Sequence, residues 1–167
     1  GNVMGSRGSV IPFFLEQRKT GVLRNTDPRM TGFNISLEEG VEVVLWAMEG
    51  AWGGGILVPK IPSYRITGVA QGIAPNCRQE VVGIRPGEKI HEEMITTSDS
   101  FNTVDLGSYY AVLPVGGAFT QDEYCLGRKA TPVEPGFAYD SGTNPDFLSV
   151  AQLRELIGKH LNNPAKG

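Results

Sequence analysis

The chain has 167 residues, of which 40% are hydrophobic and 20% charged, and it carries a formal net charge of -3 with a pI near 5.4. This composition suits one globular domain or a large part of one, and the acidic balance argues against nucleic acid as the main partner. No apolar run approaches the roughly 18 residues of a membrane span, and the first residues lack the order of a signal peptide. We therefore expect a cytoplasmic protein with no nucleic-acid and no membrane partner.

Two helices are predicted in the first third of the chain. The first should run over about 9–19, because Ser9 can begin it and Gly21 follows its end. The second should begin after Ser36, where Glu39 completes a capping box, and end near Gly50. Apolar residues recur on one face of this second helix.

Short strands and helices alternate in the rest of the chain. Glycines and a proline bound the apolar run 55–60, which is typical of a buried strand, and a short helix should begin near Thr67. Residues 80–85 and 109–114 have strand patterns, and Ser149 with Gln152 opens a last helix. Glycine and proline between 116 and 145 predict an irregular surface tail. This order predicts an α/β fold.

The opening segment GNVMGSRGSVIPFF is rich in glycine. The chain starts at Gly1, and its first methionine is Met4 inside a turn, so we expect it to be cut from a longer protein. The GSRGS turn, with Arg7, precedes a helix start and could bind a phosphate. The alternative is a tight connection with a solvated arginine. The turn is neither a Walker loop nor a dinucleotide fingerprint.

The segment NTDPRMTGF (25–33) lies between the two helices. Asp27 and Pro28 are turn residues, and Arg29, Met30 and Phe33 could form a semi-apolar wall with one cation beside a planar base. A structural turn with a surface ion pair is the reading that we favour from the residues alone.

Two further segments could contact a ligand. Lys60 follows the strand predicted at 55–60, at the sheet edge where ligands of α/β proteins bind, although a solvated lysine is commoner. In GIRPGEKIHEEM a strand should end at Arg85, and the Pro-Gly turn would let Arg85 and Glu88 point the same way. Arginine can bind a diphosphate and a carboxylate can accept from ribose hydroxyls, but a local Arg–Glu ion pair is equally compatible.

Cysteine and histidine show no metal-binding spacing. Cys77 and Cys125 are isolated, so we expect reduced thiols and no disulfide. His91 and His160 lack neighbouring ligands, so no metal site is predicted.

The segments GNVMGSRGSVIPFF, TDPRMT, LEEGV, VPKIPS and GIRPGEKIHEEMI, in this order, resemble the C-terminal half of the inverting UDP-N-acetylglucosamine 4,6-dehydratases. These are extended short-chain dehydrogenase/reductase enzymes and polysaccharide biosynthesis proteins. SFNTVDLGSYYAVLP and PGFAYDSGTNPDFLSVAQLRELI extend the resemblance through essentially the whole chain. It implies the C-terminal part of a Rossmann-type α/β fold without its dinucleotide-binding N-terminal part.

The resemblance also implies an organisation and a chemistry. Residues 1–115 would form the substrate-binding lobe with the last elements of the Rossmann sheet, and 116–167 a tail and helix. Such enzymes use NADP to take hydride from C4 of the sugar, lose water across C5 and C6, and return hydride to C6. Inversion at C5 gives a 4-keto-6-deoxy-L-arabino-hexose on the route to pseudaminic acid. The full-length lyase would act on UDP-N-acetylglucosamine and form homo-oligomers.

The resemblance assigns site residues by position. Those that would contact the substrate are Asn2, Ser6, Arg7, Gly8, Ser9, Val10, Arg29, Met30, Thr31, Lys60, Arg85 and Glu88. Val3 would lie beside the nicotinamide end of the cofactor. The cofactor fingerprint of the family and its catalytic Y-x-x-x-K and Asp-Lys pairs would precede Gly1, so we expect no catalytic residue here, and NADP bound mainly elsewhere. Tyr124 with Arg128 lacks the lysine of the Y-x-x-x-K pair, and we take it as coincidence.

One residue departs from the family pattern. Where the pattern reads R-M-T-R-F, this chain has Gly32, and loss of a charge-assisted contact would weaken binding by roughly 1.5 to 3 kcal/mol unless Arg29 or Lys60 replaces it. Two alternatives stay open at this point. One is a sister nucleotide-sugar dehydratase or epimerase, and the other is a non-catalytic nucleotide-sugar binding fragment.

Overall fold

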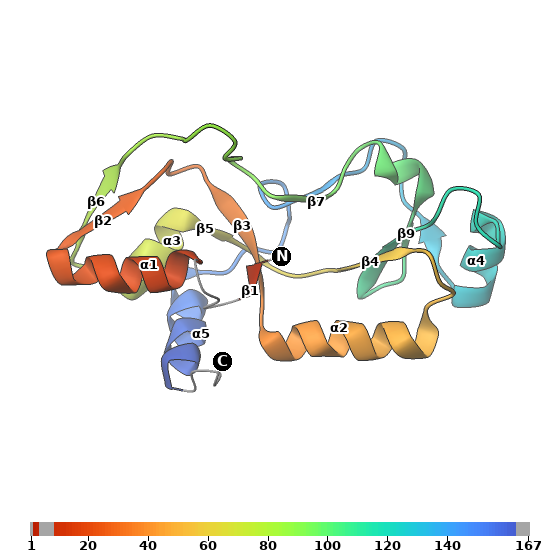
Figure 1. The fold of residues 1–167 in the computed structure, drawn as a ribbon, viewed down its shortest axis with the longest axis horizontal. Coiled ribbons are helices and arrows are strands. Elements are labelled where there is room, and N and C mark those ends of the chain that lie inside the picture. Colours follow the sequence, from red (N-terminus) through yellow and green to blue (C-terminus); the bar gives the residue numbers. More distant parts are fainter. Residues whose placement is uncertain (1, 4–8, 163–167) are drawn as a thin grey trace. The chain divides into compact units, whose positions relative to one another are not determined.

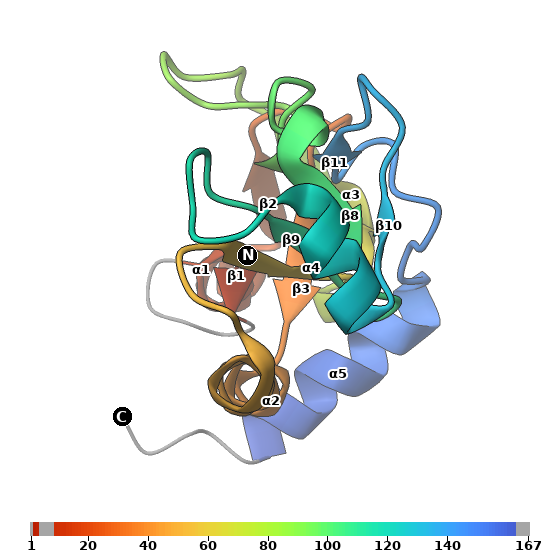
Figure 2. The ribbon, with the colours of Figure 1, turned by 90° about the vertical axis from the view of Figure 1, so that its right-hand side faces the viewer.

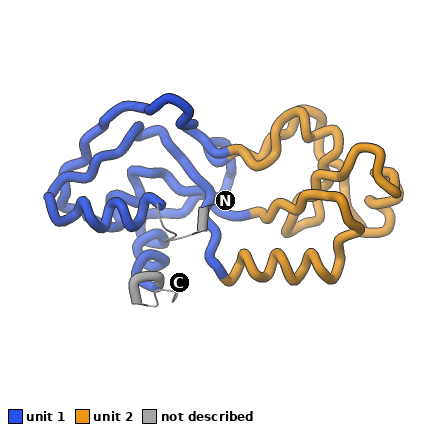
Figure 3. The backbone as a smooth tube through the Cα atoms, viewed as in Figure 1, with its two compact units in different colours: residues 1–37, 61–92, 141–167 blue, residues 38–60, 93–140 orange. Residues whose placement is uncertain are grey.

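The computed structural model describes residues 2–3 and 9–162, and the chain forms two compact units (Figure 3). Unit 1 comprises 1–37, 61–92 and 141–167, and unit 2 comprises 38–60 and 93–140. These ranges differ from the expected lobe of residues 1–115 and tail of residues 116–167. Each unit is assembled from segments that lie far apart in the sequence.

Unit 1 contains helices and two small sheets (Figure 1). Its elements are β1 (Asn2–Val3), α1 (Val10–Gln17), the 3-10 turn η1 (Arg18–Thr20), β2 (Val22–Asn25), β3 (Thr31–Ile35), β5 (Ser63–Arg65), α3 (Ile66–Ile73), β6 (Arg78–Val81) and α5 (Val150–Asn162). Strand β3 lies between β1, to which it is parallel, and β5, to which it is antiparallel. Strands β2 and β6 form a separate parallel pair.

The core of unit 1 lies between its helices and β2. Phe14 of α1, Leu23 of β2, Val69 of α3 and Leu153 of α5 are each at most 1% exposed. Helices α3 and α5 approach closely because α3 has no side chain at Gly68, where a Cβ would lie 3.3 Å from Leu153 Cδ1. This packing fixes α3, which begins directly after β5.

Unit 2 is built on an antiparallel sheet of strand order β10-β8-β9-β4. Its elements are α2 (Leu37–Gly50, whose first residue belongs to unit 1), β4 (Ile56–Pro59), β7 (Glu93–Ile95), the 3-10 turn η2 (Asp99–Asn102), β8 (Thr103–Asp105), β9 (Tyr109–Val112), α4 (Gln121–Arg128), β10 (Thr131–Pro132) and β11 (Tyr139–Asp140). Helix α4 covers this sheet (Figure 2), and its Tyr124 packs with Val104, Ala111 and Leu113.

Most predicted elements are confirmed. Helix α1 with η1 matches 9–19 and ends at Gly21 in the left-handed conformation, and α2, α3 and β9 lie at the predicted positions. The capping box of α5 is present: Gln152 N–H donates to Ser149 Oγ at 3.3 Å, and Ser149 N–H donates to Gln152 Oε1 at 2.9 Å.

Three predictions are wrong in part. The strand expected at 80–85 is β6, which ends at Val81, because the chain turns at Gly83 with φ +89°. The run 55–60 forms β4, but as an edge strand whose Ile56 is 65% exposed, so it is not a fully buried strand. The region 116–145 is not an irregular tail, since it contains α4, whose Thr120 and Glu123 form a capping box.

No helix among the described residues is both long enough and apolar enough to span a bilayer.

Candidate functional site

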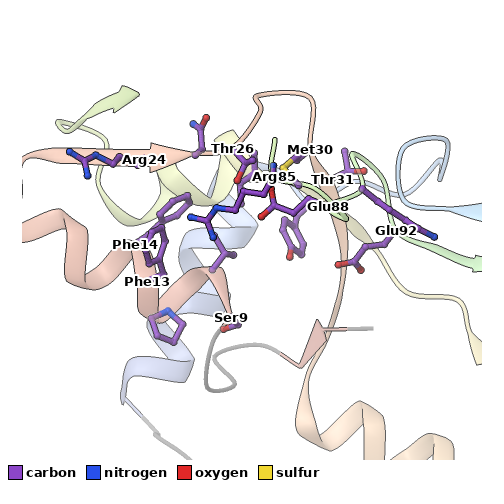
Figure 4. A pocket seen from close by; sticks show the side chains of 16 residues that line it. Ser9, Phe13, Phe14, Arg24, Thr26, Met30, Thr31, Arg85, Glu88 and Glu92 are labelled. Atoms are coloured by element: carbon purple, nitrogen blue, oxygen red, sulfur yellow. The ribbon is translucent and has the colours of Figure 1, made fainter. Parts of the chain in front are cut away.

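A cavity of about 590 Å³ lies in unit 1 (Figure 4). Its walls come from the start of α1, the end of β2, the beginning of β3, the junction of β5 with α3, and the loop after β6. Volumes of this size are typical of small-molecule sites.

The cavity combines an apolar wall with charged side chains of both signs. The apolar and aromatic residues are Val10, Pro12, Phe13, Phe14, Met30, Tyr64 and Ile66. The charged residues are Arg24, Arg85, Lys89, Glu88 and Glu92. A basic excess beside aromatic rings suits an anionic ligand that has a planar apolar part.

Arg85 and Glu88 are brought together by a tight turn. Glu88 N–H donates to the Arg85 carbonyl at 3.1 Å, and Gly87 has φ +87°, as the third residue of a type II turn requires. Glu88 Oε2 accepts from Arg85 N–H at 2.9 Å. Among the described residues no carboxylate pairs with the Arg85 guanidinium, so the local Arg–Glu side-chain pair is not the arrangement here. Both side chains project into the cavity (Figure 4).

Thr31 of β3 joins the cavity to a side-chain network. Its Oγ1 lies 2.8 Å from His91 Nδ1 and 2.7 Å from Ser141 Oγ. Ser141, which is fully buried, also accepts from Glu92 N–H at 2.8 Å. The network therefore ties the loop after β6 to β3 and to the segment that precedes α5.

Two buried oxygens of cavity-lining residues have no hydrogen-bond partner among the described residues. They are Ser9 Oγ, at the N-cap of α1, and Asn25 Oδ1, at the end of β2. Buried polar atoms are normally paired with protein, water or ligand. These oxygens are consistent with a site that binds a polar ligand or ordered water.

Arg29 forms a local ion pair outside the cavity lining. Its guanidinium donates to Asp27 Oδ1 at 3.0 Å and Oδ2 at 2.8 Å. These hydrogen bonds are the main reason that the pKa of Asp27 falls from 3.8 to about 2. This is the structural turn with a surface ion pair that the residues alone favour, and a substrate role for Arg29 stays a prediction.

Substitution of Arg29 by glutamine should return the pKa of Asp27 toward its ordinary value. Because the folded-state pKa is lowered, the pair stabilises the folded protein above pH of about 4 and loses its effect as pH falls through about 2. An NMR titration of the Asp27 carboxyl in the wild type and in the variant measures the two pKa values. The same low midpoint in the variant would show that the Arg29 side chain is not the cause, since the backbone N–H of residue 29 still donates to Asp27 Oδ1.

Lys60 lies in unit 2, where its ammonium contacts Asp105 at 2.7 Å and the Tyr110 ring at 4.4 Å. The strand before it pairs antiparallel with β9, so Lys60 does not stand at the carboxyl edge of a parallel sheet as expected. Its role in substrate binding stays a prediction.

The opening segment is only partly described. Ser6, Arg7 and Gly8 lie outside the described residues, and Asn2 and Val3 are described as strand β1, which pairs with Asn34 and Ile35. Of the other predicted residues, Ser9, Val10, Met30, Thr31, Arg85 and Glu88 line the cavity.

Sequence reasoning missed several lining residues. Phe13, Phe14, Arg24, Tyr64, Lys89 and Glu92 all contribute to the walls. Lys89 and Glu92 belong to the motif GIRPGEKIHEEM, and their closeness to Arg85 in the sequence could have identified them as candidate site residues. The aromatic residues carry no comparable signal in the sequence. Tyr124 is buried in unit 2, and burial raises the pKa of its phenol.

Comparison with known proteins gives consistent matches. The family described as "Polysaccharide biosynthesis protein" matches residues 1–114. The inverting UDP-N-acetylglucosamine 4,6-dehydratase of Campylobacter jejuni is 46% identical over 163 residues, which cover 94% of this chain and 49% of the relative. A UDP-glucose 4-epimerase of Rickettsia canadensis is 40% identical over 163 residues, with 94% and 47% covered.

A solved structure also matches. Pen from Bacillus thuringiensis has a TM-score of 0.78 and 29% identity, with 96% of this chain and 48% of that chain covered. The chain thus spans about half the length of the relatives that it matches.

Proposed function

The chain belongs to the polysaccharide biosynthesis protein family, and from this premise we propose that it is the nucleotide-sugar-binding part of a UDP-N-acetylglucosamine 4,6-dehydratase of the inverting type. The longer enzyme would be a lyase that makes UDP-2-acetamido-2,6-dideoxy-L-arabino-hex-4-ulose, on the route to pseudaminic acid and surface glycans. The 46% identity to a relative of that name supports this reaction above others.

The observation that carries the proposal is the joint presence of Arg85 and Glu88 in one cavity with aromatic walls. An arginine without a carboxylate partner can bind a diphosphate through two N–H groups. Glu88 can accept from ribose hydroxyls while it holds the Arg85 backbone N–H. Phe13 and Met30 offer apolar surface to a base.

Val3 of β1 beside the nicotinamide end of NADP stays the one cofactor contact that we propose for this chain. The sequence has no G-x-G-x-x-G turn, and its nearest echo of a catalytic pair, Tyr124 with Arg128, lies in unit 2. We propose that the remainder of a longer enzyme supplies the cofactor site and the catalytic residues, and no reaction step is assigned to this chain. Its residues bind and orient the nucleotide sugar.

Calorimetry with UDP-N-acetylglucosamine tests the proposal. Arg85→Ala should weaken binding by roughly 1.5 to 3 kcal/mol, because a charge-assisted contact to the diphosphate is lost. Arg154→Ala is the matched control, since Arg154 is exposed on α5 and does not line the cavity. Equal affinities of the wild type and Arg85→Ala would refute the role given to Arg85.

A 4-epimerase is the second candidate, favoured by the 40% identity to UDP-glucose 4-epimerases. Titration of the same protein with UDP-glucose separates the two. Tighter binding of UDP-N-acetylglucosamine supports the dehydratase, and tighter binding of UDP-glucose supports the epimerase.

A further inference from the structure

The loop that carries Arg85 and Glu88 is held chiefly at its two ends. Residues 82–90, here called the Arg85 arm, are exposed except for the half-buried Ile90. At its start, Val82 and Gly83 N–H groups donate to the carbonyls of Asn25 and Thr26 at 2.9 and 3.1 Å. At its end, the Ile90 carbonyl accepts from Thr31 N–H at 2.9 Å. The position of Arg85 in the cavity therefore depends on these attachments.

The C-terminal attachment continues through His91. Its Nδ1 meets Thr31 Oγ1, which meets Ser141 Oγ, which accepts from Glu92 N–H. Thr31 and Glu92 also line the cavity. The imidazole thus links the end of the arm to β3 by a side-chain contact that adds to the backbone bond of Ile90.

The available donors and acceptors indicate which groups donate in this network of His91, Thr31 and Ser141. If Ser141 donates to Thr31, and Thr31 donates to an unprotonated His91 Nδ1, both hydroxyl protons are used. If Nδ1 carried the proton and donated it to Thr31, the contact between Thr31 and Ser141 would use one hydroxyl proton, and the other would have no acceptor among the described residues. Both residues are buried, so that arrangement is costly. The acceptor form of Nδ1 is favoured.

The imidazole is also held sterically. A Cβ at Gly142 would lie 2.6 Å from His91 Nδ1 and 2.7 Å from Cγ, closer than real side chains approach. Gly142 has no positive φ, so alanine would meet no backbone strain there, and the three atoms nearest to its Cβ would all belong to the His91 ring.

We propose that His91 is a positioning residue: through Thr31 it fixes the C-terminal end of the Arg85 arm and so places Arg85 and Glu88 for the nucleotide sugar. The proposal rests on the function proposed above, because it takes that ligand as the occupant of the cavity. His91 itself contacts no part of the ligand in this role.

Affinity for UDP-N-acetylglucosamine gives the first test. His91→Ala should weaken binding about three- to tenfold, the effect of one lost hydrogen bond. His91→Asn should retain most of the affinity, because asparagine Oδ1 supplies an acceptor near the position of Nδ1. Wild-type affinity in His91→Ala, or no rescue by His91→Asn, would overturn the role of the acceptor.

Gly142→Ala gives a second test that keeps the imidazole. It should weaken binding like His91→Ala by displacing the ring, and it should add little in a His91→Ala background. Additive losses in the double variant would show that Gly142 acts independently of His91 and would contradict the proposal.

Trypsin cleavage after Lys89 tests the arm without any ligand. His91→Ala should speed this cleavage, whereas cleavage after exposed Lys19 in η1 should stay unchanged. Equal rates after Lys89 in the wild type and the variant would overturn the positioning of the arm. If the wild type binds no UDP-N-acetylglucosamine, the proposed function and the ligand half of this inference both fail, and the cleavage rates still decide whether His91 holds the arm.

Discussion

Replacement of Phe14 by alanine is expected to lower the free energy of unfolding by about 3–5 kcal/mol. The ring is 1% exposed and packs in the core of unit 1 with Leu23, Val69 and Leu153. It also lines the cavity together with Met30 and Arg85, so its loss removes part of the cavity wall. Chemical denaturation followed by circular dichroism measures the loss of stability, and calorimetry measures the loss of UDP-N-acetylglucosamine binding.

Phe13→Ala is the matched control for this substitution. The two rings are neighbours with centroids 6.0 Å apart, and both line the cavity, but Phe13 is 49% exposed. Its truncation should cost much less stability, because less apolar area leaves water when it folds. Equal denaturation midpoints for the two variants would show that burial of Phe14 does not support unit 1.

The parts of the fold that could be predicted are those specified by local residues. Ser149 and Gln152 lie three residues apart and cap α5, and Gly21 ends the first helical segment through its own backbone freedom. The same capping pattern at Thr120 and Glu123 predicts α4. It is easily missed because the surrounding glycines and prolines and the few apolar residues of α4 give a weak helical periodicity.

The residues of the candidate site also differ in whether local sequence or long-range contacts place them. The Arg85–Glu88 arrangement follows from a turn of four residues, so the sequence alone is enough to suggest it. Thr31 meets partners 60 and 110 residues away, and such contacts depend on how distant segments assemble. Lys60 shows the opposite failure: the strand was predicted, but its antiparallel pairing with β9 could not be derived from its own residues.

Gly32 occupies a position of β3 that leaves little room for a side chain. The sequence suggests that an absent arginine weakens substrate binding. In β3, however, Gly32 lies opposite Tyr64 of β5, and a Cβ at Gly32 would stand 2.7 Å from the Tyr64 hydroxyl oxygen and 2.8 Å from Cζ. Tyr64 lines the cavity. The space in which an arginine side chain would begin is therefore filled by a ring that belongs to the cavity wall.

Gly32→Arg is accordingly expected to destabilise the protein by about 3 kcal/mol, because it overpacks the Tyr64 ring and brings a charge to a buried strand position. Gly32→Ala separates the steric part from the charge. Combining Gly32→Arg with Tyr64→Ala should restore part of the stability and allow the arginine to reach the ligand, with binding tightened by roughly 1.5 to 3 kcal/mol relative to Tyr64→Ala alone. Chemical denaturation of the single and double variants measures the change in stability, and calorimetry measures the change in UDP-N-acetylglucosamine binding. The contrary result is a Gly32→Arg variant that is as stable as the wild type and binds UDP-N-acetylglucosamine more tightly. Tyr64 would then not prevent an arginine side chain at position 32, and the absence of the arginine alone would weaken substrate binding in this chain.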